Sequence, residues 1–330
     1  MNFPMSWPKI TIQRENGETA EAQAPVIVSA SRSTDIPAFY ADWFFRRLEV
    51  GYSAWTNPFN GAQSFVSYQN TRFIVFWSKN PEPLLKHIDY LKERNIGCYI
   101  QFTLNDYEAE GLERGVPPLA HRIDTFRRLV DTLGKGRVVW RFDPLILTDK
   151  ISPESLLQKI ENIGNQLNGY TEKLVFSFAD IALYKKVKAN LERNRVRYTE
   201  WTEEQMDRFA AQLSELNKQW GYQLATCGEK IDIEQYGILH NRCIDDDLMI
   251  RFAHTDNALM DFLGVEIKTR EMSLFGAEPI PQNAVIINDN LYAIKHKDNR
   301  DKGKDISETA RTRQSAYQRH ITSQDRWLSS

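Results

Sequence analysis

The sequence predicts an α/β protein whose parallel sheet forms a complete or partial (β/α) barrel of the TIM type. Short apolar runs, typical of buried parallel strands, alternate with helical segments along the chain. About seven such units favour a closed or nearly closed barrel, with an open, doubly wound sheet as the alternative. The length of 330 residues, 42% of them hydrophobic, is sufficient for a barrel core, which needs about 250 residues.

Seven apolar runs are the expected strands. They cover residues 26–30, 53–56, 73–77, 98–103, 138–142, 174–178 and 222–226. The run at residues 53–56 is short, and we expect the other six to be parallel strands of one sheet. Two of these six lying antiparallel in separate sheets would contradict the prediction.

Helical patterns follow most of these runs. The expected helices cover residues 39–49, 81–94, 119–133, 181–192 and 203–220. Gly51 and Gly134 follow two of them at positions typical of helix ends. Ser152 and Pro153 predict the N-cap and the first residue of a further helix.

The alternation of strands and helices defines the expected domain organisation. The barrel domain should cover residues 26–264, after an N-terminal extension of residues 1–25. The pattern weakens after residue 262, which indicates a C-terminal extension over residues 265–303. Residues 304–330 are polar with charges of both signs, so we expect a partly disordered tail there.

Composition argues against several classes of function. The net charge of −2 provides no strong field for nucleic acid, which would need a local basic groove. No apolar run is long enough to span a membrane, and the N-terminal residues do not resemble a signal peptide. Three cysteines fit a reducing compartment, so we expect a cytoplasmic protein without a membrane partner. Walker A, GxGxxG and GxSxG motifs are absent from the sequence.

Polar residues gather at the carboxyl ends of the expected strands, where parallel α/β folds place their sites. Arg32, Lys79 and Arg141 would suit an anionic substrate, because Arg offers a bidentate fork and Lys a point charge. Trp77 would stack on a base or a sugar, although core packing is the commoner role of such a residue. The expected substrate-binding residues are Arg32, Ser33, Asn57, Trp77, Lys79, Asn80, Gln101, Thr103 and Arg141.

Three carboxylates at these strand ends are the expected catalytic acids and bases, or ligands of a hard cation: Asp35, Asp143 and Glu229. A structural alternative exists for two of them. Asp35 is equally suited to cap the helix that begins at Ile36, and Asp143 would pair with Arg141 to hold strand register. For Arg141 we favour binding of a ligand over such an internal pair.

The cysteines fall into two groups. Cys98 begins an apolar strand and is expected in the core. Cys227 and Cys243, with His240 nearby in sequence, are the expected metal ligands, for zinc or for part of an iron–sulfur cluster. Their spacing is not a CxxC motif, so the pattern alone is weak evidence for a metal.

Taken together, the strand-end segments resemble the bacterial family DUF1848, in order from about residue 26 to residue 303. The segments that carry the resemblance are residues 29–37, 55–58, 76–81, 101–103, 140–144 and 227–247. The family is similar to radical SAM enzymes, which implies a barrel holding a [4Fe–4S] cluster and S-adenosylmethionine. The Arg-Phe-Asp-Pro sequence at residues 141–144 also resembles the spore photoproduct lyase type of these enzymes.

The sequence departs from this family near its C-terminal end. Family members usually carry a cysteine-rich segment there, whereas residues 304–330 contain no cysteine. A [4Fe–4S] cluster normally needs three or four thiolates, and Cys98, Cys227 and Cys243 are the only cysteines of the sequence. The chain has lost the cluster, or its end reflects a shifted reading frame, or the barrel works without a cluster.

These observations lead to one favoured function and two alternatives. The favoured one is an enzyme of radical SAM-like ancestry that acts on an anionic or nucleotide-type substrate. The first alternative is a metal-dependent or cofactor-free barrel enzyme that acts on a phosphorylated substrate through Asp35, Asp143 and Glu229. The second is a non-catalytic barrel that binds nucleic acid or a partner protein.

Overall fold

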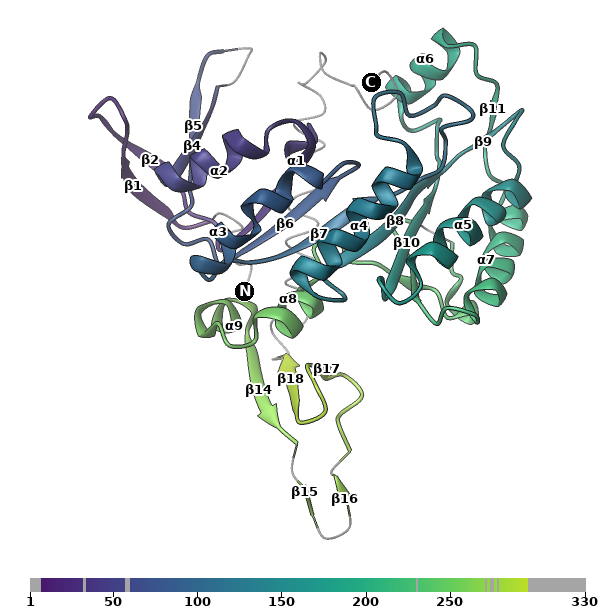
Figure 1. The fold of residues 1–330 in the computed structure, drawn as a ribbon. Helices are drawn as coiled ribbons and strands as arrows, with labels where there is room; N and C mark the ends of the chain where they lie inside the picture. The colour runs from purple at the N-terminus through teal and green to yellow at the C-terminus, as the bar shows by residue number, and fades with distance from the viewer. Residues whose placement is uncertain are drawn as a thin grey trace.

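The computed structural model describes residues 7–31, 34–56, 60–229, 231–270, 272–273, 276–277 and 279–295. Its centre is a seven-stranded parallel sheet in the order β13-β12-β10-β8-β7-β6-β3 (Figure 1). The strands are β3 (Ile27–Ala30), β6 (Phe73–Ser78), β7 (Gly97–Thr103), β8 (Val138–Leu145), β10 (Lys173–Phe178), β12 (Gln223–Thr226) and β13 (Leu239–His240).

The order of the strands in the sheet is the order that a (β/α) barrel has. Neighbouring strands follow one another along the chain, whereas the strand order of a doubly wound sheet reverses at a switch point. Among the described residues, the outer strands β3 and β13 do not pair with each other. The predicted parallel α/β architecture is therefore confirmed, while closure into a barrel is not seen.

All six runs predicted to share one parallel sheet do so, but the short run at residues 53–56 does not join it. That run forms β4 (Tyr52–Thr56), which pairs antiparallel with β5 (Gln63–Ser67) in a separate sheet with β1 (Lys9–Gln13) and β2 (Thr19–Gln23). Only six residues separate β4 from β5, too few for the crossover that a parallel pair would need. The seventh strand is instead β13, two exposed residues without an apolar run.

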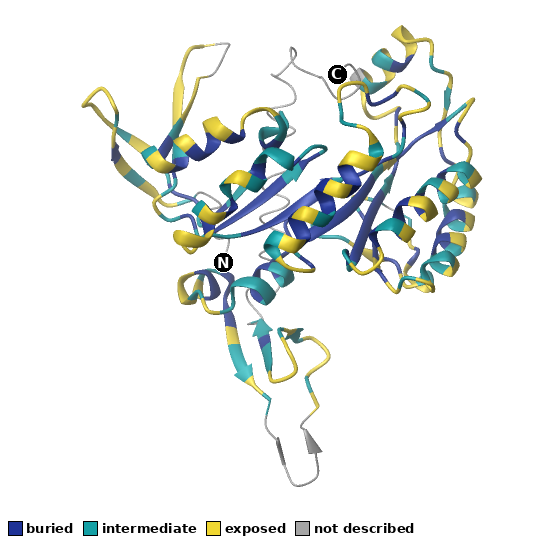
Figure 2. Cartoon of the chain, in the orientation of Figure 1, coloured by how far each residue is buried: buried dark blue, intermediate teal, exposed yellow. Residues whose placement is uncertain are grey.

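Helices cover one face of the sheet, which we call the outer face. They are α1 (Ile36–Phe39), α2 (Ala41–Val50), the 3₁₀ helix η1 (Glu82–His87), α3 (Ile88–Glu93), α4 (Leu119–Leu133), α5 (Pro153–Leu167), α6 (Lys185–Arg193) and α7 (Glu203–Asn217). Ile74 and Phe76 of β6 pack in the large core on this face. The sides of the helices that face the sheet are buried, and their far sides are exposed (Figure 2).

The opposite face, which we call the inner face, packs on two short helices. Phe73 and Val75 of β6 lie in a second cluster with Met249 of α8 (Asp246–Ala253) and Leu259 of α9 (Asn257–Leu263). Because side chains alternate along a strand, apolar residues of β6 serve both cores. This explains why the parallel strands read as continuous apolar runs.

Several helix ends follow the predicted signals. The α2 helix ends at Gly51, whose φ of 92° favours glycine, and Ser152 caps α5 ahead of Pro153. The helix expected at residues 81–94 is instead η1 followed by α3. The helix expected from residue 181 begins later, at Lys185. The backbone amides of residues 181 and 182 donate to the Glu200 carboxylate.

Smaller elements complete the fold. They are β9 (Leu147–Thr148), β11 (Tyr198–Thr199), η2 (Glu234–Tyr236), β14 (Val265–Thr269), β15 (Met272–Ser273), β16 (Gly276–Ala277), β17 (Val285–Ile286) and β18 (Leu291–Lys295). Strands β14 to β18 extend away from the central sheet (Figure 1). The tail predicted at residues 304–330 lies outside the described residues. None of the described helices is long and apolar enough to cross a membrane.

Candidate functional site at the carboxyl end of the sheet

Strand alternation places a group of polar side chains on the inner face. Trp77 follows Val75 by two residues on β6, and Arg141 follows Val139 by two on β8, so each shares the inner face with its predecessor. In the ladder, Trp77 lies opposite Gln101 of β7. The sheet thus brings side chains from distant parts of the chain together near its carboxyl end.

Arg141 is the centre of this group and is only 2% exposed. Its guanidinium pairs with the Asp143 carboxylate, donates to Gln101 Oε1 at 3.3 Å, and lies 5.0 Å from the centre of the Trp77 ring. Trp77 Nε1 in turn donates to Ser29 Oγ at 3.1 Å. Arg141 therefore links side chains of three strands.

The pairing is the one that the structural alternative for Arg141 described, and binding of a ligand by Arg141 stays a prediction. Asp143 balances its charge within the protein, as in the alternative stated for this residue. Burial by itself lowers the pKa of Arg141, but the charge of Asp143 and its hydrogen bond outweigh burial and raise the pKa above the ordinary value. Arg141 is consequently charged at every physiological pH.

Asp143 is held from several sides. Its Oδ1 accepts from Ser177 Oγ, and its backbone N–H donates to Asn105 Oδ1 at 2.9 Å. Burial alone would raise the pKa of Asp143, but Arg141 and the Ser177 hydroxyl more than compensate, so the pKa is lowered. Asp143 is an ionised carboxylate at neutral pH.

The pKa of Glu229 is shifted in the opposite direction to that of Asp143. The backbone N–H of Phe178 donates to Glu229 Oε1 at 2.8 Å. Burial, followed by the charges of Asp143 and Asp180, raises the pKa of Glu229 to about 7. Two consecutive residues of β10, Ser177 and Phe178, thus hold two carboxylates, one with a lowered pKa and one with a raised pKa.

Ser177 and Asn105 contact Asp143, yet neither was among the predicted site residues. Ser177 carries a recognisable signal, because it is the one polar residue in the apolar run at 174–178. Its period-two spacing from Val175, which faces the inner cluster, would have placed it on the inner face. Asn105 lies in a loop, where no period predicts the direction of a side chain.

Asp35 and Lys79 have structural partners. Asp35 caps α1, with Oδ1 accepting from the Ala38 amide at 3.0 Å and Oδ2 from the Lys79 amide at 2.8 Å. Burial raises the pKa of Asp35 despite these hydrogen bonds. The Lys79 ammonium pairs with Glu113 at 2.5 Å, and the Glu113 side chain is only 3% exposed. Glu113 was not predicted, and it balances the Lys79 charge.

The remaining predicted substrate-binding residues are only partly described. Thr103 lies opposite Arg141 in the ladder, and the backbone amide of Asn80 donates to Ser78 Oγ at 2.9 Å. Arg32, Ser33 and Asn57 lie outside the described residues. Their predicted role in binding a substrate stays a prediction.

The three cysteines divide as expected. Cys98 is buried in the outer-face core, where burial raises the pKa of its thiol to about 11. Cys227 and Cys243 are half-buried with their sulfur atoms 3.5 Å apart. Cys227 packs with Val139, Val175 and other inner-face residues.

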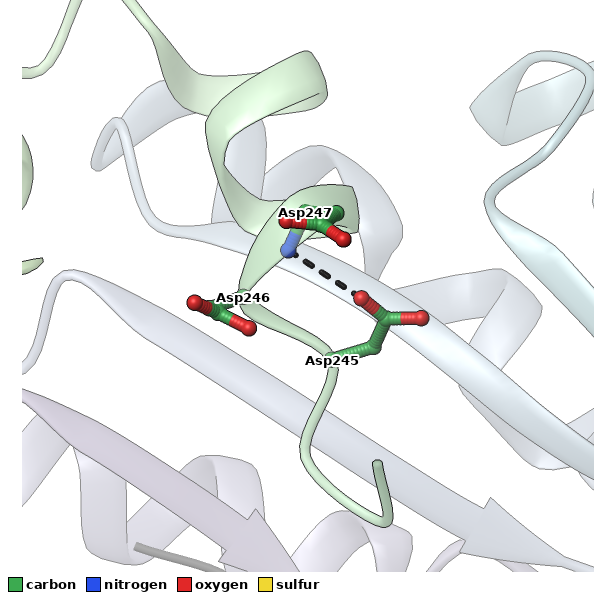
Figure 3. Close-up of side chains that lie close together, drawn as sticks. All are labelled: Asp245, Asp246 and Asp247. Atoms are coloured by element: carbon green, nitrogen blue, oxygen red, sulfur yellow. Dashed lines mark hydrogen bonds between the residues drawn. The ribbon is translucent and has the colours of Figure 1, made fainter. Parts of the chain in front are cut away.

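Three consecutive aspartates at the start of α8 form the single group of at least three metal-type ligands found among the described residues (Figure 3). Asp245 pairs with Lys173 at 2.8 Å, and Lys295 lies 2.5 Å from both Asp246 and Asp247. Arg242 pairs with Asp246 and Asp247 as well. Three cations thus balance three carboxylates, which indicates a structural cluster at a helix N-terminus.

A family model supports the relationship that the motifs indicated. The model of DUF1848, a domain of unknown function, matches residues 27–272. The chain belongs to the DUF1848 family. The matched segment begins at β3 and contains every side chain described above except Lys295, so the candidate site lies within the family's domain. Comparison of the DUF1848 chain with curated proteins found no match.

The cysteines of this DUF1848 protein do not fit the [4Fe–4S] cluster that the family resemblance implies. Such a cluster normally needs three or four thiolates, and the sequence contains three cysteines. Cys98 packs on the outer face, so only Cys227 and Cys243 share a site. Two thiols are also half of a tetrahedral zinc site, and metal binding by this pair stays a prediction.

Proposed function

We propose that this DUF1848 protein is an enzyme that performs acid–base chemistry on a small polar molecule at the carboxyl end of its parallel sheet. One observation carries the proposal: two consecutive residues, Ser177 and Phe178, hold the carboxylates of Asp143 and Glu229. Asp143 also pairs with the buried Arg141. Carboxylates whose environments separate their protonation states are typical of an acid and a base in one active site.

The proposed roles follow from the surroundings of each group. Asp143 stays ionised beside Arg141 and would orient the substrate through its lone pairs. Glu229 exchanges its proton near neutral pH, and would deliver a proton to the substrate or remove one. No step runs through a cluster or a metal ion, so the proposal corresponds to the cofactor-free alternative derived from the sequence.

We further propose an anionic or nucleotide-type substrate. Trp77 provides an aromatic ring beside the Arg141 guanidinium, and Arg141 has more N–H groups than its pairing with Asp143 and Gln101 uses. Because Asp143 balances the charge of Arg141, the substrate's negative charge would need a further cation. Arg32, predicted at the end of β3, is our candidate for that cation.

A ligand screen followed by one substitution tests this function. We would measure binding of nucleotides, sugar phosphates and small carboxylic acids by thermal shift, and then measure turnover of the molecules that bind. Glu229→Gln should retain binding and lose turnover by about 100-fold or more, the usual contribution of a general acid or base.

The matched control is Glu234→Gln, because Glu234 lies on the exposed helix η2 five residues further along the chain. This control should behave as the wild type does. Equal turnover by Glu229→Gln and wild type would disprove the role assigned to Glu229. A ligand that binds equally well after Trp77→Ala and Arg141→Lys would show that the binding site lies elsewhere.

The raised pKa of Glu229 also predicts a pH-dependent effect on stability. The folded state keeps Glu229 protonated up to about pH 7, whereas its ordinary pKa is 4.5. The stability contributed by the neutral form is therefore complete below pH 4.5 and is lost as pH rises through 7. Glu229→Gln mimics the neutral form and should raise the free energy of unfolding at pH 8 by about 1–2 kcal/mol, after allowance for solvent screening.

Urea denaturation at pH 8 and at pH 4.5 measures this effect. At pH 4.5 the Glu229→Gln variant and the wild type should have nearly equal free energies of unfolding. Glu234→Gln should leave the free energy of unfolding nearly unchanged, because its side chain is exposed. A Glu229→Gln variant that is less stable than wild type at pH 8 would show that the carboxylate is stabilising there.

A further inference from the structure

We propose that Cys227 and Cys243 are a redox-active dithiol that closes to a disulfide and reopens by exchange with other thiols. Their sulfur atoms are 3.5 Å apart, and bonded sulfurs lie about 2.0 Å apart. Rotation of the two side chains, which are both half-buried, would supply the remaining approach. Cys98 cannot take part in this disulfide, because it is buried in the core of the outer face.

The surroundings hold the two sulfurs close together. Cys227 packs with Val139 and Val175 on the inner face of the sheet. In the reduced form one thiol is hydrogen-bonded to the other. The two reacting atoms are therefore neighbours before any oxidant binds.

The co-reactant is a low-molecular-weight disulfide such as oxidised glutathione. The thiolate of one cysteine attacks a sulfur of this disulfide, forms a mixed disulfide and releases one thiol. The second cysteine then attacks the mixed disulfide and releases the other thiol. The protein loses two S–H bonds and gains one S–S bond, while two electrons and two protons pass to the co-reactant.

The disulfide would act on the neighbouring site. It would join the end of β12 to the segment before α8, closing a loop that contains Glu229 and β13. It would also remove the thiol of Cys227 that interacts with Arg141. This consequence rests on the proposed function, whereas formation of the disulfide does not.

Thiol counting tests the inference directly. The full-length protein would be equilibrated in buffers of stepwise ratios of reduced to oxidised glutathione, with a chelator present, and alkylated after unfolding. We expect the number of alkylated thiols to fall from three to one as the buffer becomes oxidising, and to return to three with dithiothreitol. Peptide mapping should identify a Cys227–Cys243 cross-link and an alkylated Cys98.

Single substitutions provide the controls. Cys227→Ser and Cys243→Ser should each abolish the cross-link, whereas Cys98→Ala should keep it. Three alkylated thiols in the most oxidising buffer would overturn the proposal, and so would separate glutathione adducts on the two cysteines without a cross-link. Both outcomes are read from the wild-type chain, so they do not depend on the folding of any variant or on binding of a substrate.

Discussion

Lys173→Met should lower the free energy of unfolding by about 3–5 kcal/mol, the largest effect expected of a single substitution among those proposed here. Lys173 Nζ lies 2.8 Å from Asp245 Oδ2, and the two side chains are 11% and 8% exposed. Without the lysine, the Asp245 carboxylate would stay buried and lose its nearest cation. Asp245 also caps α8 through the amides of Asp247 and Leu248, so it cannot easily turn towards solvent.

Urea denaturation at pH 7 measures this loss. Burial alone would raise the pKa of Asp245, but the charge of Lys173 and its hydrogen bond reverse this, and the pKa is lowered. The stability contributed by ionised Asp245 is therefore present above its ordinary pKa of 3.8 and is lost as pH falls below it. In Lys173→Met this acid-dependent contribution should be much smaller.

Two further variants separate the ion pair from loss of the lysine side chain. Lys173→Met combined with Asp245→Asn removes both charges and should recover part of the lost stability. Lys218→Met removes a surface lysine that is 71% exposed, and it should leave the stability nearly unchanged. A loss below about 1 kcal/mol in Lys173→Met would show that the pair is much less important than its burial indicates.

The second large effect is expected at Arg141. Arg141→Met should lower the free energy of unfolding by about 3 kcal/mol, because Asp143 would lose the cation that keeps it ionised. The loss should lie at the low end of the range for buried pairs, since the Asp143 side chain is 25% exposed and water can partly replace the guanidinium.

Denaturation of Arg141→Met, Asp143→Asn and the double variant forms a cycle that isolates the coupling of the pair. The double variant should be more stable than the sum of the two single losses implies. An unchanged or higher free energy of unfolding in Arg141→Met would contradict the structural role. It would indicate that Arg141 is kept for binding a ligand although it does not stabilise the fold. Loss of ligand binding alongside the loss of stability is expected, because Arg141 lies at the centre of the proposed site.

The parallel strands were predictable because their signal is local. A strand buried on both faces needs apolar side chains at nearly every position. Residues 73–77 are accordingly a continuous apolar run, and residues 174–178 are apolar except for Ser177. Residues 53–56 show the limit of this signal. The run is a strand, as expected, but its neighbour β5 follows without a crossover helix and pairs with it in another sheet. Strand β13 has no apolar run, and it was not predicted, although it pairs with the edge strand β12.

For the candidate site, the sequence by itself determined which residues follow the strands and, through the period of two, which of them share a face. Trp77, Gln101 and Arg141 could be brought together in this way. Only the tertiary structure decided which partner each group has there. It paired Arg141 with Asp143, paired Lys79 with Glu113 and placed the sulfurs of Cys227 and Cys243 at 3.5 Å.

The reason for this division is physical. Strand period and helix capping depend on residues a few positions apart, so they can be read along the chain. The charge state of a buried group depends on desolvation and on charges from distant segments, as Glu229 shows beside Phe178 and Asp143. Those distances exist only after the strands have assembled, and for this reason the tertiary structure decided which groups of the site are paired and how their pKa values shift.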